Sequence, residues 1–319
     1  MGDDVQENLF SVLKNYGEDL TIKKYLSDPS IARDNELKKL MMVLLTPEKS
    51  ALLVGPAGVG KTSIVEGLAY RILNNAVPVA LQGYKVIKLN SSSLVGKINY
   101  NGREQLIVTL LVEELMKIDK VIVFIDEIHT LIGNGSNSMD LANILKPAID
   151  RGAVKLIGAT TDAEYNAYVI RDRAFLRRFE RIDILEPDQK TTVEILYKSL
   201  PKIEGKTGIK FKYNEYVTKM LLESIVSATS EYKRVYGLSA MYPDIAFSVL
   251  TAAFSEALFQ NRQFVTVLDV YNAIKESKRI YPDSIIRELD LFREKFKDVT
   301  SLDGITLPIV SINEINNSE

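Results

Sequence analysis

The chain has 319 residues, of which 46% are hydrophobic and 26% are charged, so it is large enough to form two globular domains. It contains no cysteine and one histidine, which excludes disulfides, thiol nucleophiles, cysteine-based zinc sites and multi-histidine metal sites. A net charge of −2 without a long basic run argues against a nucleic-acid binder. The N-terminus is acidic and no apolar run approaches the roughly 20 residues that cross a bilayer, so we expect a cytoplasmic protein without membrane insertion.

Short apolar runs follow a polar leader segment at residues 1–27 and predict a parallel β-sheet. Most of the runs are continuous rather than alternating, which is typical of strands buried on both faces. They are ALLVG at 51–55, YKVIKLN at 84–90, VIVFIDE at 121–127, VKLIGAT at 154–160 and IDILEP at 182–187. TSIVEGLAYRILNN, between the first two, has the apolar spacing of an amphipathic helix. The order of strands and helices predicts an α/β domain with a five-stranded parallel sheet over residues 28–187.

Only helical periodicity follows Pro187, and it predicts a small all-helical lid domain over residues 188–281. Thr266 and Asp269 resemble a capping box that opens the last of its four helices. We expect residues 282–319 to form a C-terminal tail with one short helix and a frayed polar end.

The sequence GPAGVGKT, residues 55–62, is called the phosphate loop here because it fits the pattern G-x-x-x-x-G-K-T between a predicted strand and a predicted helix. Its backbone amides would cradle phosphates, Lys61 would reach the β- and γ-phosphates of ATP, and the Thr62 hydroxyl would bind Mg²⁺. The alternative is a glycine-rich turn without function. The predicted nucleotide-binding residues are Gly55, Pro56, Ala57, Gly58, Val59, Gly60, Lys61, Thr62 and Ser63.

The segment SLVGKINYNGREQ, residues 93–105, places Tyr100 among asparagines and glycines that favour a loop with a solvent-facing tip. An aromatic side chain there either folds back onto its own domain or serves a function at the surface. Composition alone leaves both interpretations open.

Asp126 and Glu127 end an apolar strand, and ligands of parallel sheets bind beyond the carboxyl ends of the strands. Asp126 would hold Mg²⁺, and Glu127 would orient and activate the attacking water. The alternative is an ordinary acidic pair at a strand end. For His129, we expect a hydrogen-bonded structural role near the site.

Two later motifs complete the candidate site. Thr161 ends the next strand and is placed either to contact the γ-phosphate or the attacking water, or to cap the helix that follows. Arg177 and Arg178 are candidates for stabilising the charge of a phosphoryl group on a neighbouring subunit, or form a solvated basic turn.

Taken together, the chain resembles the first ATPase module of the Clp unfoldases and disaggregases, a group of AAA+ ATPases. The similarity covers roughly residues 15–250. It is carried by YGEDLTIKKY, DPSIARDNEL, GPAGVGKTSIVEGLAYRI, VIVFIDEIHTLIG, NILKPAIDRGAVKLIGATTDAEY and FLRRFERI. The resemblance implies that Ile31 and Ala32 line the adenine pocket, although the family usually has glycine at the position of Ala32. It also implies that Thr161 is the residue called sensor 1, and that Arg177 and Arg178 are arginine fingers.

In the Clp group, a tyrosine after the second strand projects into the channel of a hexamer, and Tyr100 falls at that position. The resemblance therefore favours a pore loop that grips polypeptides. Residues 133–138 fall where the family has a second pore loop. Two departures stand out: Asn99 and Asn101 replace the basic neighbours of the tyrosine, and Ile245 replaces a lysine of the lid.

The resemblance implies an ATP- and Mg²⁺-dependent motor that self-associates into a ring, expected to be a hexamer, and remodels, unfolds or threads protein substrates. One alternative is a nucleotide-switched assembly or regulatory ATPase with a dedicated protein partner, which a single phosphate loop and an altered pore loop would suit. Another is an AAA+ ATPase that acts on DNA, against which the weak basic character argues.

Overall fold

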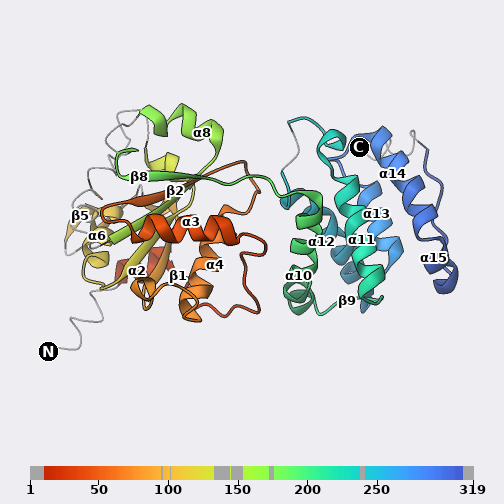
Figure 1. Ribbon diagram of the computed structural model, residues 1–319, viewed down its shortest axis with the longest axis horizontal. Coiled ribbons are helices and arrows are strands. Elements are labelled where there is room, and N and C mark those ends of the chain that lie inside the picture. The colour runs from red at the N-terminus through yellow and green to blue at the C-terminus, as the bar shows by residue number, and fades with distance from the viewer. Residues whose placement is uncertain are drawn as a thin grey trace. The chain divides into compact units, whose positions relative to one another are not determined.

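The computed structural model describes residues 11–94, 96–100, 102–132, 144, 154–171, 176–237 and 241–311 (Figure 1). The chain divides into two compact units. The first comprises Met1–Pro56 and Gly60–Leu185, and the second comprises Ala57–Val59 and Glu186–Glu319. The first unit is an α/β layered structure and the second is helical.

The first unit is built on a six-stranded sheet with the order β1-β3-β6-β7-β2-β8. Its strands are β1 (Gly17–Asp19), β2 (Ser50–Val54), β3 (Lys85–Leu89), β6 (Val121–Ile125), β7 (Val154–Thr160) and β8 (Phe179–Asp183). The five strands from β3 to β8 are parallel, and every residue of β2 and β6 is buried, in keeping with their continuous apolar runs. The prediction of a parallel α/β sheet is therefore confirmed.

The sixth strand corrects the predicted strand count of five. β1 pairs antiparallel with β3 at the edge of the sheet, where Gly17 lies opposite Leu89. Its three residues, Gly-Glu-Asp, are too few to form an apolar pattern, so the sequence did not indicate this edge strand.

Helices surround this sheet. They are α2 (Ser11–Tyr16), α3 (Asp34–Leu45), α4 (Lys61–Leu73), α5 (Ser91–Leu94), α6 (Ile107–Leu115) and α8 (Asp162–Ala167), with 3₁₀ turns η1 (Val79–Leu81), η2 (Ile128–Leu131) and η3 (Val169–Arg171). The core joins the apolar faces of α2 and α6 to β3, β6 and β7. Within the described part of the chain, no helix has the length and apolar character needed to cross a membrane.

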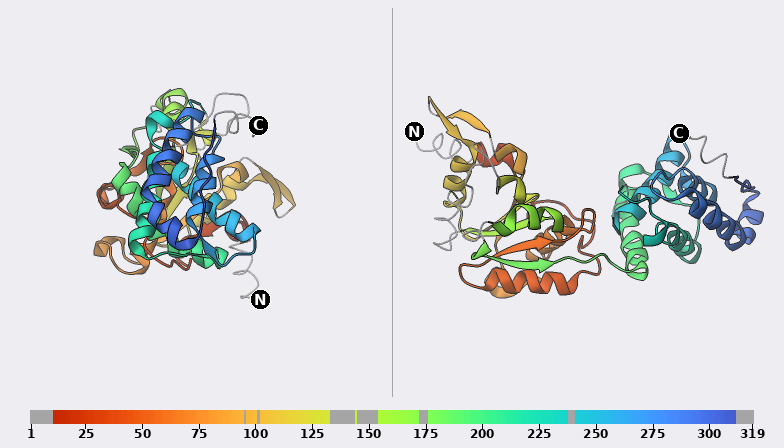
Figure 2. Two further views of the ribbon diagram at one scale, coloured as in Figure 1. Left: turned by 90° about the vertical axis from the view of Figure 1, so that its right-hand side faces the viewer. Right: turned by 90° about the horizontal axis from the view of Figure 1, so that it is seen from above.

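A β-hairpin occupies the segment that was expected to be a loop. β4 (Lys97–Tyr100) pairs antiparallel with β5 (Arg103–Leu106), so that Tyr100 lies opposite Arg103. The hairpin stands out from the main sheet (Figure 2). The alternation Lys-Ile-Asn-Tyr is the signal that the sequence interpretation missed, because it puts Ile98 and Tyr100 on one half-buried face.

The second unit packs its helices into a bundle (Figure 1). They are α10 (Gln189–Thr207), α11 (Glu215–Ala228), α12 (Asp244–Phe259), α13 (Val267–Lys275), α14 (Pro282–Lys295) and α15 (Lys297–Asp303), together with η4 (Glu231–Lys233), β9 (Lys210–Phe211) and β10 (Phe264–Val265). Helix α14 buries Ile285, Leu289 and Phe292 in the same core as α11 and α12. The capping box predicted from Thr266 and Asp269 is confirmed at the start of α13.

Candidate active site

The phosphate loop begins where β2 ends, and its first residue has no room for a side chain. A Cβ atom on Gly55 would lie 2.2 Å from the carbonyl oxygen of Ile184. The Gly55 N–H donates to the carbonyl oxygen of Thr160 at 3.3 Å. Gly55 therefore holds the loop against the strands on both sides of β2, as only glycine can at this approach.

The loop leads directly into α4, and its glycines supply the backbone geometry. Gly58 and Gly60 have φ angles of 77° and 98°, which lie in the left-handed region that favours glycine. Gly60 is the N-cap of α4 and provides no side chain to cap the first turn. The N–H groups of that turn are consequently available to an anion, which the helix dipole also favours.

Lys61 opens α4 and turns its ammonium back toward the loop. Its Nζ donates to the carbonyl oxygens of Gly55 at 2.8 Å and Pro56 at 3.0 Å. Burial lowers the pKa of Lys61, and the nearby carboxylates, chiefly Asp126, oppose that shift. The cation is thus held beside the loop and partly shielded from water.

Thr62 and Asp126 meet across the site although 64 residues separate them. Thr62 Oγ1 donates to Asp126 Oδ2 at 2.8 Å. The contact follows from the strand order, because β2 and β6 both flank β7 and end at the same edge of the sheet. A hydroxyl and a carboxylate side by side are the hard oxygen ligands that Mg²⁺ takes together with phosphates and water, so the residues present fit that ion.

Glu127 adopts an unusual backbone conformation directly after Asp126. Its φ of 51° is left-handed, and its carbonyl oxygen accepts the hydroxyl of Thr130 at 2.9 Å. The side chain is exposed. Asp126 and Glu127 line a cleft of about 570 Å³ together with residues of α2, β1, the end of β3 and the start of α5, including Tyr16 and Lys88.

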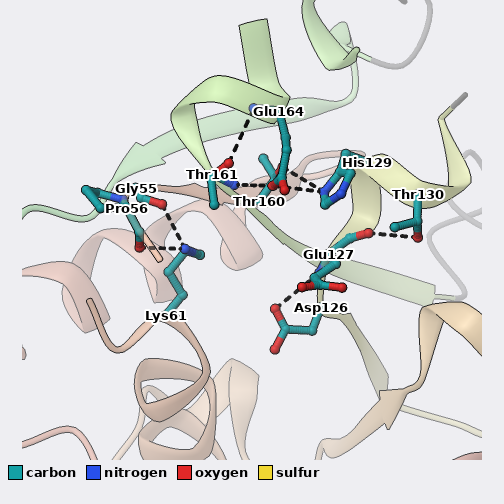
Figure 3. A network of polar contacts seen from close by, with 10 residues as sticks. All are labelled: Gly55, Pro56, Lys61, Asp126, Glu127, His129, Thr130, Thr160, Thr161 and Glu164. Carbon is teal, nitrogen blue, oxygen red and sulfur yellow. Dashed lines mark hydrogen bonds and ion pairs between the residues drawn. The ribbon is translucent and has the colours of Figure 1, made fainter. Parts of the chain in front are cut away.

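Strand β7 ends at Thr160 beside these carboxylates, and Thr161 follows it directly (Figure 3). Thr161 is the N-cap of α8 and forms a capping box with Glu164, so the capping alternative is realised in the structure. Thr160 Oγ1 lies 3.2 Å from Nδ1 of His129, and Oε2 of Glu164 lies 3.1 Å from the same nitrogen. His129 therefore has the hydrogen-bonded role that was predicted. Glu164 was missed, although the spacing Thr-x-x-Glu was a readable signal.

The candidate adenine segment is anchored to α4. A Cβ atom on Gly67 would lie 2.2 Å from the Cβ atom of Ser30, so the segment lies directly on the helix backbone. Arg71 binds Asp28 at 3.1 Å and Asp34 at 2.5 Å. Ile31 and Ala32 lie between Ser30 and Asp34. Ile31 is half-buried, and Ala32 has a φ of 56°. The left-handed conformation gives a physical reason for the glycine of the family pattern.

Arg177 and Arg178 lie at the opposite edge of the sheet. Their carbonyl oxygens accept the Lys49 ammonium at 3.0 Å and the Ser50 N–H at 2.8 Å, respectively, at the start of β2. The phosphate loop follows the end of β2, and a strand of five residues spans roughly 16 Å. The structure thus brings together Lys61, Thr62, Asp126, Glu127 and Thr161, but not the two arginines.

The remaining predictions concern the pore and the lid. Tyr100 is half-buried and packs against the core of the first unit. Asn99 is exposed on the same strand, whereas Asn101 and the expected second pore loop at 133–138 lie outside the described residues. Ile245 is fully buried in the core of the second unit, where the family pattern has lysine.

Comparison with known proteins places this geometry in a family. Residues 51–186 match the ATPase family associated with various cellular activities (AAA). The chaperone protein ClpB of Wolinella succinogenes is 36% identical over 287 residues, which cover 88% of this chain and 32% of the relative. A probable ATP-dependent Clp protease ATP-binding subunit of Chlamydia pneumoniae is 36% identical over 258 residues, which cover 79% of this chain and 29% of the relative. The chain thus spans about a third of the length of these relatives.

Solved structures agree with the sequence comparison. The extended conformation of the S. cerevisiae Hsp104–casein complex has a TM-score of 0.69 and 29% identity, covering 91% of this chain and 52% of that chain. The S. cerevisiae Hsp104–ADP complex has a TM-score of 0.67 and 30% identity, covering 95% and 51%. The predicted resemblance is confirmed: the chain belongs to the AAA family of ATPases and carries an ATP-binding module of the Clp type.

Proposed function

We propose that this module hydrolyses ATP with Mg²⁺ at the site formed by the phosphate loop and the carboxylates after β6. The 2.8 Å contact between Thr62 and Asp126 carries the proposal, because it joins two oxygen ligands from distant segments at the mouth of the loop. Mg²⁺, when bound, would neutralise charge that develops on the β- and γ-phosphates.

The protein side chains divide the work of hydrolysis among them. Lys61 places a positive charge beside the loop amides that bind phosphate, while Ile31 and Ala32 flank the adenine. Glu127 acts as the general base that orients a water and takes its proton, and its exposed carboxylate in the cleft leaves room for that water. Thr161 contacts the γ-phosphate or the water from the end of β7.

The arginines act between subunits in this proposal. Arg177 and Arg178 are tied to the edge of the sheet opposite their own phosphate loop, so a second copy must supply them to an ATP site. Such arginines can raise a phosphoryl-transfer rate by roughly 10³- to 10⁵-fold. In a closed ring, each subunit supplies its arginines to the ATP site of its neighbour, so every site is complete. We expect the ring to have six subunits.

The ring remodels or threads protein substrates, and Tyr100 grips them. Two observations support this function: the similarity to an Hsp104–casein complex, and the hairpin of β4 and β5, which stands out from the main sheet (Figure 2) and has Tyr100 in its first strand. Gripping requires the ring of Tyr100 to leave its packing against the core, because its side chain is half-buried there.

That packing favours a second candidate function. A tyrosine that serves its own domain suits a nucleotide-switched assembly ATPase, which binds one protein partner and threads nothing. An activity on DNA remains the third candidate, and the net charge of −2 argues against it.

The ATPase rate of the purified protein tests these functions, alone and with casein or single-stranded DNA. We expect Lys61→Ala and Glu127→Gln to abolish turnover, casein to stimulate the wild type, and Tyr100→Ala to remove the stimulation. If single-stranded DNA stimulates the ATPase rate and casein does not, a nucleic-acid function would take the place of protein threading. If Tyr100→Ala keeps full stimulation by casein, Tyr100 does not grip the substrate and instead has a structural role in its own domain.

A further inference from the structure

One carboxylate oxygen of Glu164 joins three groups at the end of β7 (Figure 3). Oε2 accepts the Thr161 N–H at 3.0 Å and the Thr160 hydroxyl at 3.3 Å. Nδ1 of His129 approaches the same oxygen at 3.1 Å. A capping box requires only the first of these contacts, so the other two connect α8 to neighbouring segments.

The third contact reaches the turn that carries Glu127. His129 belongs to η2, the 3₁₀ turn whose N-cap is Glu127. Because Oε2 of Glu164 is an anionic acceptor, we assign the Nδ1 proton to this hydrogen bond. The imidazole also stacks on Tyr168, with ring centroids 6.2 Å apart and planes inclined by 20°. Two partners, Glu164 at the edge of the ring and Tyr168 on its face, therefore set the orientation of the imidazole.

Backbone packing brings the same two segments together. A Cβ atom on Gly158 of β7 would lie 2.8 Å from Cδ1 of Ile128, so the strand has a glycine where the turn crosses it. Thr130 holds the carbonyl oxygen of Glu127 through its hydroxyl and its N–H. The turn is consequently fixed at its beginning by Thr130 and against β7 by Ile128 and His129.

We propose that Glu164 and His129 are positioning residues of the ATPase reaction, which tie the backbone of the catalytic base Glu127 to the strand-end threonines. The inference rests on the proposed function. Through this link, a displacement of Thr160 or Thr161 by the γ-phosphate moves the turn of Glu127 with it. Neither residue is among those proposed to bind ATP, so both should affect the rate of the chemical step and not the binding of nucleotide.

Steady-state ATPase kinetics of His129→Ala, Glu164→Ala and the double variant test the link. We expect each single change to lower kcat about tenfold, because a small misplacement of a catalytic group is costly, while the KM for ATP stays within about twofold. The double variant should lose no more than either single variant, because both changes break one connection. His129→Asn, which keeps an N–H donor near the position of Nδ1, should recover most of the lost rate.

Two controls separate this link from a loss of folding. Glu164→Gln keeps an acceptor for the Thr161 N–H but removes the anion, so it should keep the helix cap and still lower kcat. Thr266→Ala removes the cap hydroxyl of α13 in the other compact unit and should leave kcat unchanged. Thermal unfolding of every variant shows whether its fold is retained.

The outcomes distinguish this inference from the proposed function. A wild type without ATPase activity would refute both. An active wild type and an inactive Glu127→Gln variant, together with wild-type kcat in the Glu164 and His129 variants, would refute the positioning role alone. The same holds if the two single losses in kcat multiply in the double variant, or if His129→Asn recovers nothing.

Discussion

Each compact unit contains a helix that begins with a capping box, and the two boxes are built into different surroundings. At α13, the carboxylate of Asp269 is 2% exposed and binds two guanidinium nitrogens of Arg262. At α8, the carboxylate of Glu164 is 32% exposed and turns to Thr160 and His129. The local motif sets where a helix begins, whereas residues from elsewhere decide what else its carboxylate does.

The two units also differ in how many residues have a strained backbone. Among the described residues, those other than glycine with positive φ are Ala32, Glu48, Asn75, Lys120, Glu127 and Asn261. Five belong to the first unit, and two of these, Ala32 and Glu127, belong to the candidate site. Strained residues persist where the surrounding structure holds them, which is common at functional sites.

The largest effect on stability is expected from removing the carboxylate of Asp269 in the second unit. Asp269→Ala leaves Arg262 without its buried partner and opens the cap of α13, so we expect the protein to lose about 3 kcal/mol of unfolding free energy. Urea unfolding, followed by the helical circular dichroism signal, measures the loss. A change below about 1 kcal/mol would show that this box is no more than an ordinary cap.

Removing the two cap hydroxyls sharpens the comparison. Thr161→Ala and Thr266→Ala should each cost about 1 kcal/mol of unfolding free energy. The first change leaves the Glu164 N–H without its acceptor, and the second removes the hydroxyl that donates to Asp269 Oδ2 at 2.8 Å. Only Thr161→Ala should also lower kcat. Equal kcat values for the two variants would contradict the role proposed for Thr161.

A smaller effect, an increase in unfolding free energy, is expected from relieving backbone strain at Ala32. Ala32→Gly removes a left-handed alanine, which costs roughly 1 to 2 kcal/mol, but adds freedom to the unfolded chain. The net stabilisation should be on the order of 0.5 kcal/mol, measured by urea unfolding. Ala80, which is exposed and is not among the residues with positive φ, provides the matched control, since glycine there should bring no gain.

The smallest effect concerns pH. Burial alone would raise the pKa of Glu164, but hydrogen bonds from Thr161 and the charge of His129 outweigh it and lower the pKa. A lowered carboxyl pKa stabilises the fold above its ordinary value of about 4.3, and this stabilisation disappears as the pH falls through the folded-state pKa. The stability difference between the wild type and Glu164→Gln should therefore shrink on acidification. A difference that is constant from neutral to acid pH would contradict the sign.

The sequence predicted the parts of this protein that depend on neighbouring residues. The apolar runs indicated the parallel strands, and Gly55 to Thr62 indicated the phosphate loop, because burial and turn geometry leave local patterns. Edge strand β1 and the hairpin around Tyr100 escaped prediction. The first has too few residues to form a pattern, and in the second the asparagines and glycines, which favour loops, obscure an alternation of only four residues.

The sequence by itself thus determined the family, the strands and the chemical groups of the candidate site. Only the tertiary structure decided that Thr62 contacts Asp126, that Glu164 reaches His129, and that Arg177 lies at the far edge of the sheet. The physical reason is the strand order, because it places β7 between β2 and β6 and thereby joins segments far apart in the chain. No local pattern records which strand becomes the neighbour of which.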